Sequence, residues 1–593
     1  MALNQTNNYR FTTPHAAIIV WNYDNRLGVD PSNNSSINTI NEIIISTVSC
    51  TSIQTNKSKG SPAGSFTFTL APNRDWVSQI TAGSWCAILM SNSPITSAQL
   101  KNADPNYVKM IGKIESVRIE VAIDQDGARH SQYVVSGTDW GYIFNNVLYI
   151  DNLIAAAKDP TNQANTFAIA LQKQLFGDKN SPQSFKVADN LVTLLGVFGA
   201  SSPGLDAASS AINRANKSVY DFLIPNEMAT YFNFVDGDGN INQSTKLSDL
   251  LTLETGKLST YDTYSDTNEA YGFIDPFSLQ GTNTFWQILM DNSNPALNEL
   301  YNEIEWEDNG QGTLGPSLTI YNRIKPFSYR TDLTTSNQVS KLRSPFTLIK
   351  THQIDNVMVT GVNMGTNWRD KYNFVEIRPQ FQDFSVIGSW TAQKSQGSDP
   401  VAFNREGFRP YIVGTKQFPV DPTSSNGVYN ANQLTTWVAL LKEWFFDTHK
   451  LLNGTLIMRG TTEYIGVGNN ILFEAGLVNP TMNINTGANI NTNTNYILAH
   501  VENVSHSFTV GPEGERTYNT TIQFVRGIVV NNNNGNALGN PNFVPVGSGS
   551  LDQLASQLPN VNYKNTINTF TTSDGINDPV HPIDPDPNKL RGT

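Results

Sequence analysis

The sequence is poor in cysteine. Cys50 and Cys86 are the only two in 593 residues. Two cysteines are too few for a disulfide framework and do not give the paired spacing of a zinc site. We expect both to be small buried hydrophobic residues of a chain that folds in a reducing cytosol.

Charge is scarce as well, since Asp, Glu, Lys and Arg make up only 15% of the chain, against roughly 25% in an average soluble domain. The polar surface must then be carried by Asn, Ser, Thr and Gln, which favour strands and tight turns. The net charge is −12, and the nearest approach to a basic run is Lys57 and Lys59 around one serine, which we interpret as a turn. Specific nucleic-acid binding normally requires a basic patch, so none is expected.

Long apolar runs are missing too. The longest lies near residues 191–200, far short of the roughly 20 residues that cross a bilayer. The first 11 residues show no basic stretch followed by an apolar one, so we expect neither a membrane span nor a signal peptide.

What the sequence does contain is strand patterning. Residues 65–70 alternate polar and apolar side chains, which is typical of a half-buried strand. Residues 124–127 (Asp-Gln-Asp-Gly) predict a hairpin turn between strands at 117–123 and 132–136. Further strands are predicted at 16–21, 43–48, 85–90 and 110–121, and a second hairpin at 297–306 and 318–324.

Four segments between 151 and 223 have helix-compatible apolar spacing, and 283–291 predicts a short helix. The chain is also too long for one hydrophobic core. We therefore expect a mainly β, multi-domain fold with a helical insertion (α+β). The expected parts are an N-terminal arm (1–15), a first β-barrel (16–140), the helical insertion (141–225), a strand-rich hairpin domain (226–345), a second β-barrel region (346–530) and an Asn/Pro-rich C-terminal tail (531–593).

Two acidic patterns invite a functional interpretation. Asp236, Asp238 and Asn240 have the spacing of the first calcium ligands of an EF-hand loop, but Ile241 and Leu247 replace its glycine and bidentate glutamate. A hairpin turn explains the same residues. A second pattern, Glu303, Glu305 and Glu307, alternates along a predicted strand. These carboxylates would share one face, as a solvated surface or, alternatively, as the acid/base pair of a glycosidase.

The histidines do not form a metal motif. None of the seven has the His-x-x-x-His or Cys-His spacing of a metal site; they are His15, His130, His352, His449, His500, His506 and His581. His500 and His506 are expected on one face of a strand, as ordinary strand residues or as a ligand pair. No nucleophile elbow or phosphate-binding loop occurs. We expect no catalytic residue, no cofactor and no enzymatic activity.

The most informative region is 496–529, which predicts two long strands around a Gly/Pro turn and carries Val504, His506, Phe508, Thr520, Ile522, Arg526 and Gly527. Earlier stretches carry Gly137 and Asp139, then Arg323, Pro326 and Phe327, then 373–375 and 405–410, then Gly454, Gly460 and Gly468. These stretches resemble, in the same order, those of phage tail baseplate hub proteins, the family that includes the late-control D proteins. In this resemblance, 496–529 corresponds to the family's closing hairpin.

The resemblance implies a structural virion protein made in the bacterial host cytoplasm. It implies a homotrimer in which each subunit contributes two hub-type β-barrels and which joins the tail tube to the central spike and other baseplate proteins. The central channel would pass DNA, and the acidic charge would let a duplex slide.

Two alternatives stay open: an adhesive, fibre-like tail component that binds host glycan, and a tail-associated peptidoglycan hydrolase dependent on Glu303 or Glu305. The tail 531–593, rich in Asn and Pro, is expected to act in assembly, or else to have no partner.

Overall fold

The structure is a computed structural model of the chain. It describes residues 13–22, 41–123, 129–146, 224–234, 247–254, 284–293, 297–308, 314–325, 349–369, 371–379, 395–415, 451–461, 463–477 and 495–531, with short pieces at 185–186, 271–272, 329–331, 340–342, 417–418, 438–448 (in part) and 544–545. Most of the expected helical insertion, the calcium-like loop at 236–242, His449, His581 and nearly all of the C-terminal tail lie outside the described residues.

The described chain is mainly β, and its largest element is one sheet of 14 strands. Its N-terminal strands, called the N-terminal block below, are β1 (His15–Asn22), β2 (Asn41–Ser46), β3 (Cys50–Ser58), β4 (Ser65–Leu70), β5 (Trp85–Ser91), β6 (Val108–Ile123) and β7 (Arg129–Asp139). Its C-terminal strands are β15 (Thr351–Gln353), β16 (Val359–Thr366), β21 (Leu452–Met458), β22 (Asn470–Glu474), β23 (Asn495–Val510), β24 (Arg516–Asn531) and β25 (Val544–Pro545).

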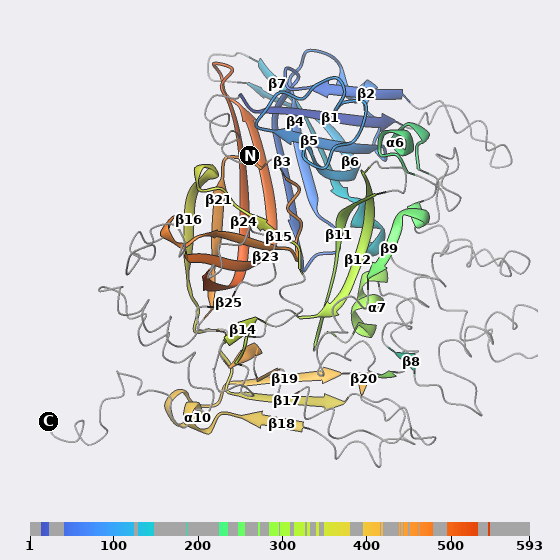
Figure 1. The fold of residues 1–593 in the computed structure, drawn as a ribbon. Coiled ribbons are helices and arrows are strands. Elements are labelled where there is room, and N and C mark those ends of the chain that lie inside the picture. Colours follow the sequence, from blue (N-terminus) through green and yellow to red (C-terminus); the bar gives the residue numbers. More distant parts are fainter. Residues whose placement is uncertain are drawn as a thin grey trace, which may run out of the picture.

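The two groups of strands are joined edge to edge. The main path runs β16-β21-β24-β23-β3-β4-β7-β6-β5-β1-β2, so the antiparallel pair β23–β3 links the N-terminal block to the C-terminal strands. In Figure 1 the long hairpin β23–β24 rises from the lower strands to the side of the blue N-terminal block. The N-terminal and C-terminal strands thus belong to one sheet. The expected division into two barrels of related topology stays a prediction.

The strands expected from local patterning are present. β4 has the bounds 65–70, and its Phe66, Phe68 and Leu70 are buried while the residues between them are not. The β6–β7 and β23–β24 hairpins are both antiparallel, as predicted. The alternation of side chains along a strand is a local property, so it can be recognised without knowing the partner strand.

β1 is buried on both faces. Ile18 and Val20 belong to a core inside the N-terminal block, whereas Ile19 and Trp21 belong to a second core outside it. A third core lies among the C-terminal strands. Cys50 and Cys86 are buried free thiols, as expected, and burial raises the pKa of both.

The helices are short. They are α1 (Trp76–Gln79), α6 (Asn226–Tyr231), α7 (Phe285–Asn292) and α10 (Pro400–Glu406), with 3-10 turns at Trp140–Asn145, Leu247–Leu250, Asn356–Met358 and Ala475–Leu477. α7 confirms the short helix predicted near 283–291, and the Thr284 side chain accepts a hydrogen bond from the Gln287 N–H at its start. The strand-rich hairpin domain was expected to begin at residue 226, but helix α6 lies there instead, and Tyr231 and Phe232 pack against Trp21.

Smaller sheets complete the fold. The predicted second hairpin is β11 (Asn298–Asp308) and β12 (Leu314–Ile324), joined by β9 (Leu251–Glu254). A separate sheet contains β17 (Phe374–Pro379), β18 (Ser395–Ser398) and β19 (Pro410–Thr415), and lies at the opposite end from the N-terminal block in Figure 1. The remaining strands are β8 (Phe185–Lys186), β10 (Tyr271–Gly272), β13 (Tyr329–Thr331), β14 (Ser340–Leu342) and β20 (Gln417–Phe418).

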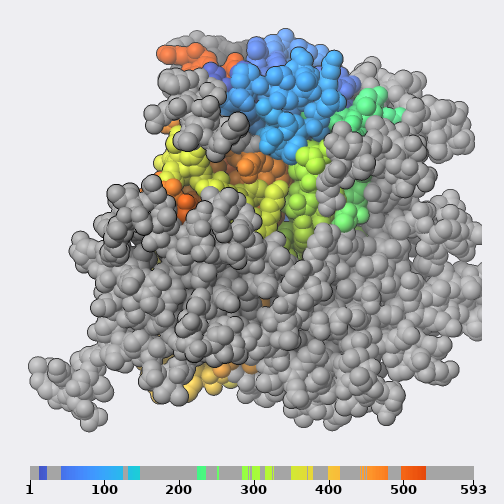
Figure 2. Space-filling view, viewed as in Figure 1, coloured from blue at the N-terminus to red at the C-terminus, as the bar shows by residue number. Residues whose placement is uncertain are grey.

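None of the helices in the described part of the chain combines the length and the apolar character that a bilayer crossing needs. The space-filling view shows the N-terminal block in direct contact with the orange C-terminal strands and the green β11–β12 hairpin (Figure 2).

Candidate functional site

A buried polar cluster lies where the N-terminal block, the β11–β12 hairpin and the segment 464–502 meet. We call it the junction. Its residues are each at most 9% exposed, and they are Lys57, Lys59, Asp139, Glu299, Asn302, Glu303, Arg323 and His500. The less buried Tyr464 and Glu502 also bond to it. Charged groups are rarely buried without partners, so each must be accounted for.

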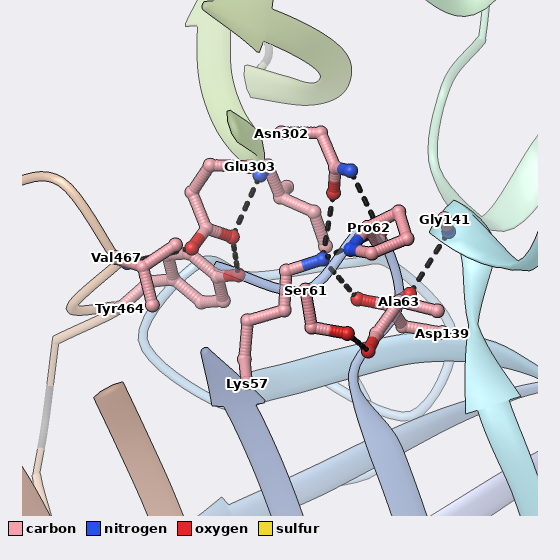
Figure 3. Close-up of polar contacts among 11 residues, drawn as sticks. Lys57, Ser61, Pro62, Ala63, Asp139, Gly141, Asn302, Glu303, Tyr464 and Val467 are labelled. Atoms are coloured by element: carbon pink, nitrogen blue, oxygen red, sulfur yellow. Dashed lines mark hydrogen bonds and ion pairs between the residues drawn. The ribbon is translucent and has the colours of Figure 1, made fainter. Parts of the chain in front are cut away.

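Lys57 is the centre of the first half of the junction (Figure 3). Its Nζ lies 2.5 Å from Oδ2 of Asp139 and donates to Oδ1 of Asn302 at 2.6 Å. Asn302 in turn donates from Nδ2 to the Pro62 carbonyl at 2.7 Å, and the other Asp139 oxygen accepts from the Gly141 N–H at 2.9 Å. One ammonium group therefore ties strand β3 to the end of β7 and to β11.

The interpretation of Lys57 and Lys59 as a turn was wrong for Lys57, which lies in strand β3 and pairs with Val504 of β23. The error has a physical cause. A lysine in a short polar sequence is normally solvated, and its burial here depends on Asp139 and Asn302, which are 82 and 245 positions away in the chain.

Glu303 of β11 occupies the same half. Its carboxylate accepts from the Tyr464 hydroxyl, from the Val467 N–H at 2.7 Å and from the Ile304 N–H at 2.9 Å. Burial raises the pKa of Glu303 to about 7, although Lys57 and these hydrogen bonds act in the opposite direction. The side chain thus titrates near neutral pH inside the protein.

The second half of the junction is built around Glu299. Lys59 Nζ lies 2.9 Å from its Oε2, and Arg323 Nε lies 2.7 Å from its Oε1. Lys59 also contacts Glu502 of β23 at 2.5 Å. Burial alone would raise the pKa of Glu299, but Lys59 and Arg323 outweigh burial and hold the pKa well below its usual value.

Arg323 extends the junction to the glycine-rich segment that follows Tyr464. Its Nη2 donates to the Gly468 carbonyl at 2.5 Å, and its guanidinium lies 5.0 Å from the centre of the Tyr301 ring. Gly468 has φ +78°, and a Cβ there would meet Tyr301 at 2.3 Å. Both the positive φ and the close approach of the Tyr301 ring therefore require a glycine at this position.

The predicted row of glutamates is only partly as expected. Glu303 is buried and bonded, so its interpretation as part of a solvated face was wrong, because both faces of β11 are covered. Glu305 is half-buried and accepts from the Tyr321 hydroxyl at 2.7 Å. The side chain of Glu307 is outside the described residues.

His500 and His506 do not share a face. Val501 and Val504 enter the same core although three positions separate them, because the β23–β24 register shifts between Val501 and Asn503. His500 lies 3.7 Å from Glu299, whereas His506 bonds to Thr520 and Tyr518. Burial lowers the pKa of both histidines.

His352 contacts Glu463 at 2.9 Å, and His15 begins β1. The side chain of His130 is outside the described residues. Within the described ranges, no group of three or more His, Cys, Asp or Glu side chains is arranged to hold a metal ion.

The contacts of the junction connect separate segments of the chain to one another. Its charges are bonded to one another and to backbone groups, and its members come from four separate parts of the sequence. Sequence reasoning missed Lys57, Lys59, Asn302 and Tyr464. The one available signal was the position of Lys57 in a period-2 pattern with Ile53 and Thr55, which are buried.

Comparison with known proteins gives matches only among solved structures. No protein-family model matches the chain, and a search of curated proteins finds no match either. The chain is similar to a tail protein from Neisseria meningitidis, with 12% identity, 86% of this chain and 96% of that chain covered, and a TM-score of 0.37. It is also similar to a 43 kDa tail protein of prophage MuSo2 from Shewanella oneidensis, with 10% identity, 86% and 98% coverage, and a TM-score of 0.34.

A third similar structure is a Francisella PdpA–VgrG complex, with 9% identity and a TM-score of 0.33. Here 86% of this chain is covered but only 58% of that chain. Two of these three structures are of tail proteins.

Proposed function

We propose that this protein is a structural component of a phage tail, namely the baseplate hub that joins the tail tube to the central spike. In this proposal it is a homotrimer in the virion and surrounds a channel that passes DNA. The observation that carries the proposal is the convergence, at the junction, of sequence stretches that resemble the hub family.

These stretches are far apart in the chain. Asp139, from the first stretch, bonds Lys57, while Arg323, from the second, bonds Glu299 and the carbonyl of Gly468 from a third. The fourth stretch forms β23–β24, which supplies Glu502. Three of the residues that suggest the family, Asp139, Arg323 and Gly468, thus take part in the contacts that hold three parts of the fold together.

An internal junction of paired charges suits a structural part that must keep one shape. Buried ion pairs contribute little net stability compared with apolar packing, but they specify one arrangement of the groups they connect. A hub must keep one shape while it contacts the tube on one side and the spike on the other. The junction would supply that rigidity, and it requires no substrate.

The N-terminal block also has a surface suited to assembly. β6 is no longer paired with β5 beyond Lys113, and the pairing of β7 with β4 ends at Tyr133, opposite Ile119. The outer part of the β6–β7 hairpin, from Glu120 to Ile123, is therefore two-stranded. Ile119, Val121 and Ile123 alternate along its outer part and are 53%, 54% and 65% exposed. A two-stranded ribbon with an apolar face is marginal alone and marks a contact surface. We assign it to the contact between hub subunits.

The decisive experiment is the mass of the purified protein in solution, combined with particle symmetry by electron microscopy. We expect a trimer, alone or after the spike protein is added, seen as a threefold ring with a central opening. An obligate interface of this kind buries more than about 2,000 Å², so the trimer should persist at micromolar concentration. A protein that stays monomeric with every tail partner would contradict the proposal.

A further inference from the structure

A second exposed apolar surface lies at the sheet of β17, β18 and β19, far from the β6–β7 ribbon (Figure 1). Trp368 is 55% exposed and Phe408 is 59% exposed. Val401 and Ile412, close by in the chain, are each 44% exposed. Large apolar side chains concentrated in one short region mark a binding surface. We call Trp368, Arg369, Phe403, Phe408 and Arg409 the aromatic–arginine patch.

Arg409 is held in place before any ligand arrives. Its guanidinium lies 3.8 Å from the centre of the Trp368 ring, and it donates to the carbonyls of Trp368 at 3.0 Å and Arg369 at 2.7 Å. The Arg409 N–H donates to Oδ1 of Asn373 at 2.8 Å. A side chain fixed in this way loses little freedom on binding, which favours affinity.

Phe408 is supported in a similar way. Its ring stacks on Phe403 of α10 with centroids 5.5 Å apart and an interplanar angle of 9°, and lies 5.2 Å from the ring of Phe374. The Asn373 side chain fixes the backbone just before it by donating to the Gly407 carbonyl at 2.6 Å. Phe408 and Arg409 are consecutive, so this short segment is held at Arg409 by Trp368 and at Phe408 by Phe403 and Phe374.

The patch is locally basic in an acidic protein. The net charge of the chain is −12, yet Arg369, next to Trp368 in the chain, and Arg405, two positions after Phe403, are both exposed. Two acidic residues of the described part of this region are engaged within the protein: Glu406 is paired with Lys371 at 2.5 Å, and Asp399 accepts from the N–H groups of Val401 and Ala402 at the start of α10. Aromatic rings together with arginines fit a partner that offers apolar ridges and carboxylates.

The same chain contains a segment with that chemistry. Residues 578–587 read Asp-Pro-Val-His-Pro-Ile-Asp-Pro-Asp-Pro. Pro579, Pro582 and Pro585 are three positions apart, so in a polyproline II helix, which has 3 residues per turn, they form one ridge. Asp578 and Asp584 share the neighbouring ridge. Proline ridges dock on aromatic surfaces with little entropy loss, because the helix is preformed.

We propose that the aromatic–arginine patch is the docking site of the chain's own C-terminal segment, residues 578–587. The proline ridge packs on Trp368 and Phe408, and the aspartates approach Arg369 and Arg409. The segment begins 33 residues after Pro545 of β25, a length that reaches about 110 Å when extended. It can therefore reach the patch of its own copy or of a neighbour. The inference goes beyond the hub proposal and does not depend on it.

The test uses the full chain as receptor, with Pro579, Pro582 and Pro585 changed to Gly so that its own segment no longer forms the ridge. A fluorescent peptide of residues 572–593 is titrated in by anisotropy. We expect binding to this receptor at least tenfold tighter than to the natural chain, whose own segment competes. Adding Trp368→Ala or Phe408→Ala should weaken peptide binding at least tenfold, and Val48→Ala, which removes an exposed side chain elsewhere, should not.

Two results would overturn the proposal: a scrambled peptide that binds equally well, or Trp368→Ala and Phe408→Ala receptors that both bind normally while retaining the natural thermal unfolding curve. Equal peptide binding by the natural and Gly-substituted chains would show that the segment does not occupy the patch. Sedimentation then distinguishes a segment bound within its own copy from a segment bound by a neighbouring copy. If the Gly substitutions reduce the mass of the natural assembly, a neighbour's segment is bound; if the mass is unchanged, the segment binds within its own copy.

Discussion

The Nζ of Lys57 lies 2.5 Å from Oδ2 of Asp139, 82 positions further along the chain. Both side chains are nearly inaccessible to solvent, and the same ammonium bonds Asn302 of the β11–β12 hairpin. The pair therefore connects two strands of the N-terminal block to a hairpin that follows much later in the sequence. The first prediction concerns this pair.

Lys57→Met should destabilise the protein by about 3–5 kcal/mol, because it leaves the Asp139 carboxylate buried without its cation. The measurement is the free energy of unfolding in urea. Adding Asp139→Asn, which removes the charge but keeps an acceptor for the Gly141 N–H, should recover much of the loss. Lys101→Met, at an exposed lysine, is the matched control and should change the free energy by less than about 0.5 kcal/mol.

Glu303 should make the stability pH-dependent. Its pKa is raised by burial from 4.5 to about 7. The folded state then holds a proton that the unfolded state has lost between these values, so this contribution is complete below about pH 4.5 and disappears as the pH rises to about 7. Its size is on the order of 3 kcal/mol. Glu303→Gln cannot titrate, so the stability difference between the two proteins should shift by that amount in favour of the variant between pH 4 and 8. A difference that does not vary with pH would contradict the buried titration.

Gly468→Ala should be strongly destabilising. The new Cβ would lie 2.3 Å from the Tyr301 ring at a backbone φ of +78°, and strain of this kind together with overpacking costs about 2–5 kcal/mol. Gly60→Ala is the matched control, because nothing lies within 4 Å of its Cβ position. Thermal unfolding of both variants gives the comparison, and equal melting temperatures would show that the 464–468 segment adapts freely.

Val121→Asp should weaken self-association by at least tenfold without unfolding the protein, because it places a charge on the apolar face of the β6–β7 ribbon. Ala122→Asp adds the same charge to the opposite, polar face and should have little effect. Sedimentation equilibrium measures the association of each variant, and circular dichroism checks the fold. If both substitutions act equally, net charge and not the apolar face controls assembly.

The sequence by itself determined the strands and hairpins whose signals are local. β4 follows from alternation alone, and the β6–β7 and β23–β24 hairpins follow from two apolar-alternating segments around a turn. Alternation along a strand and the turn between two strands are each contained in a short stretch of sequence, so no distant partner is needed to recognise them. The same holds for the burial of Cys50 and Cys86.

Only the tertiary structure decided the junction and the faces of β23. Glu303 was singled out by its alternation, yet its burial depends on Tyr464 and Val467, more than 160 positions away. A register shift in β23, set by pairing with β24, placed His500 and His506 on different sides. A charged side chain can be buried only where partners replace its water, and those partners come from segments that are neighbours only after the chain has folded.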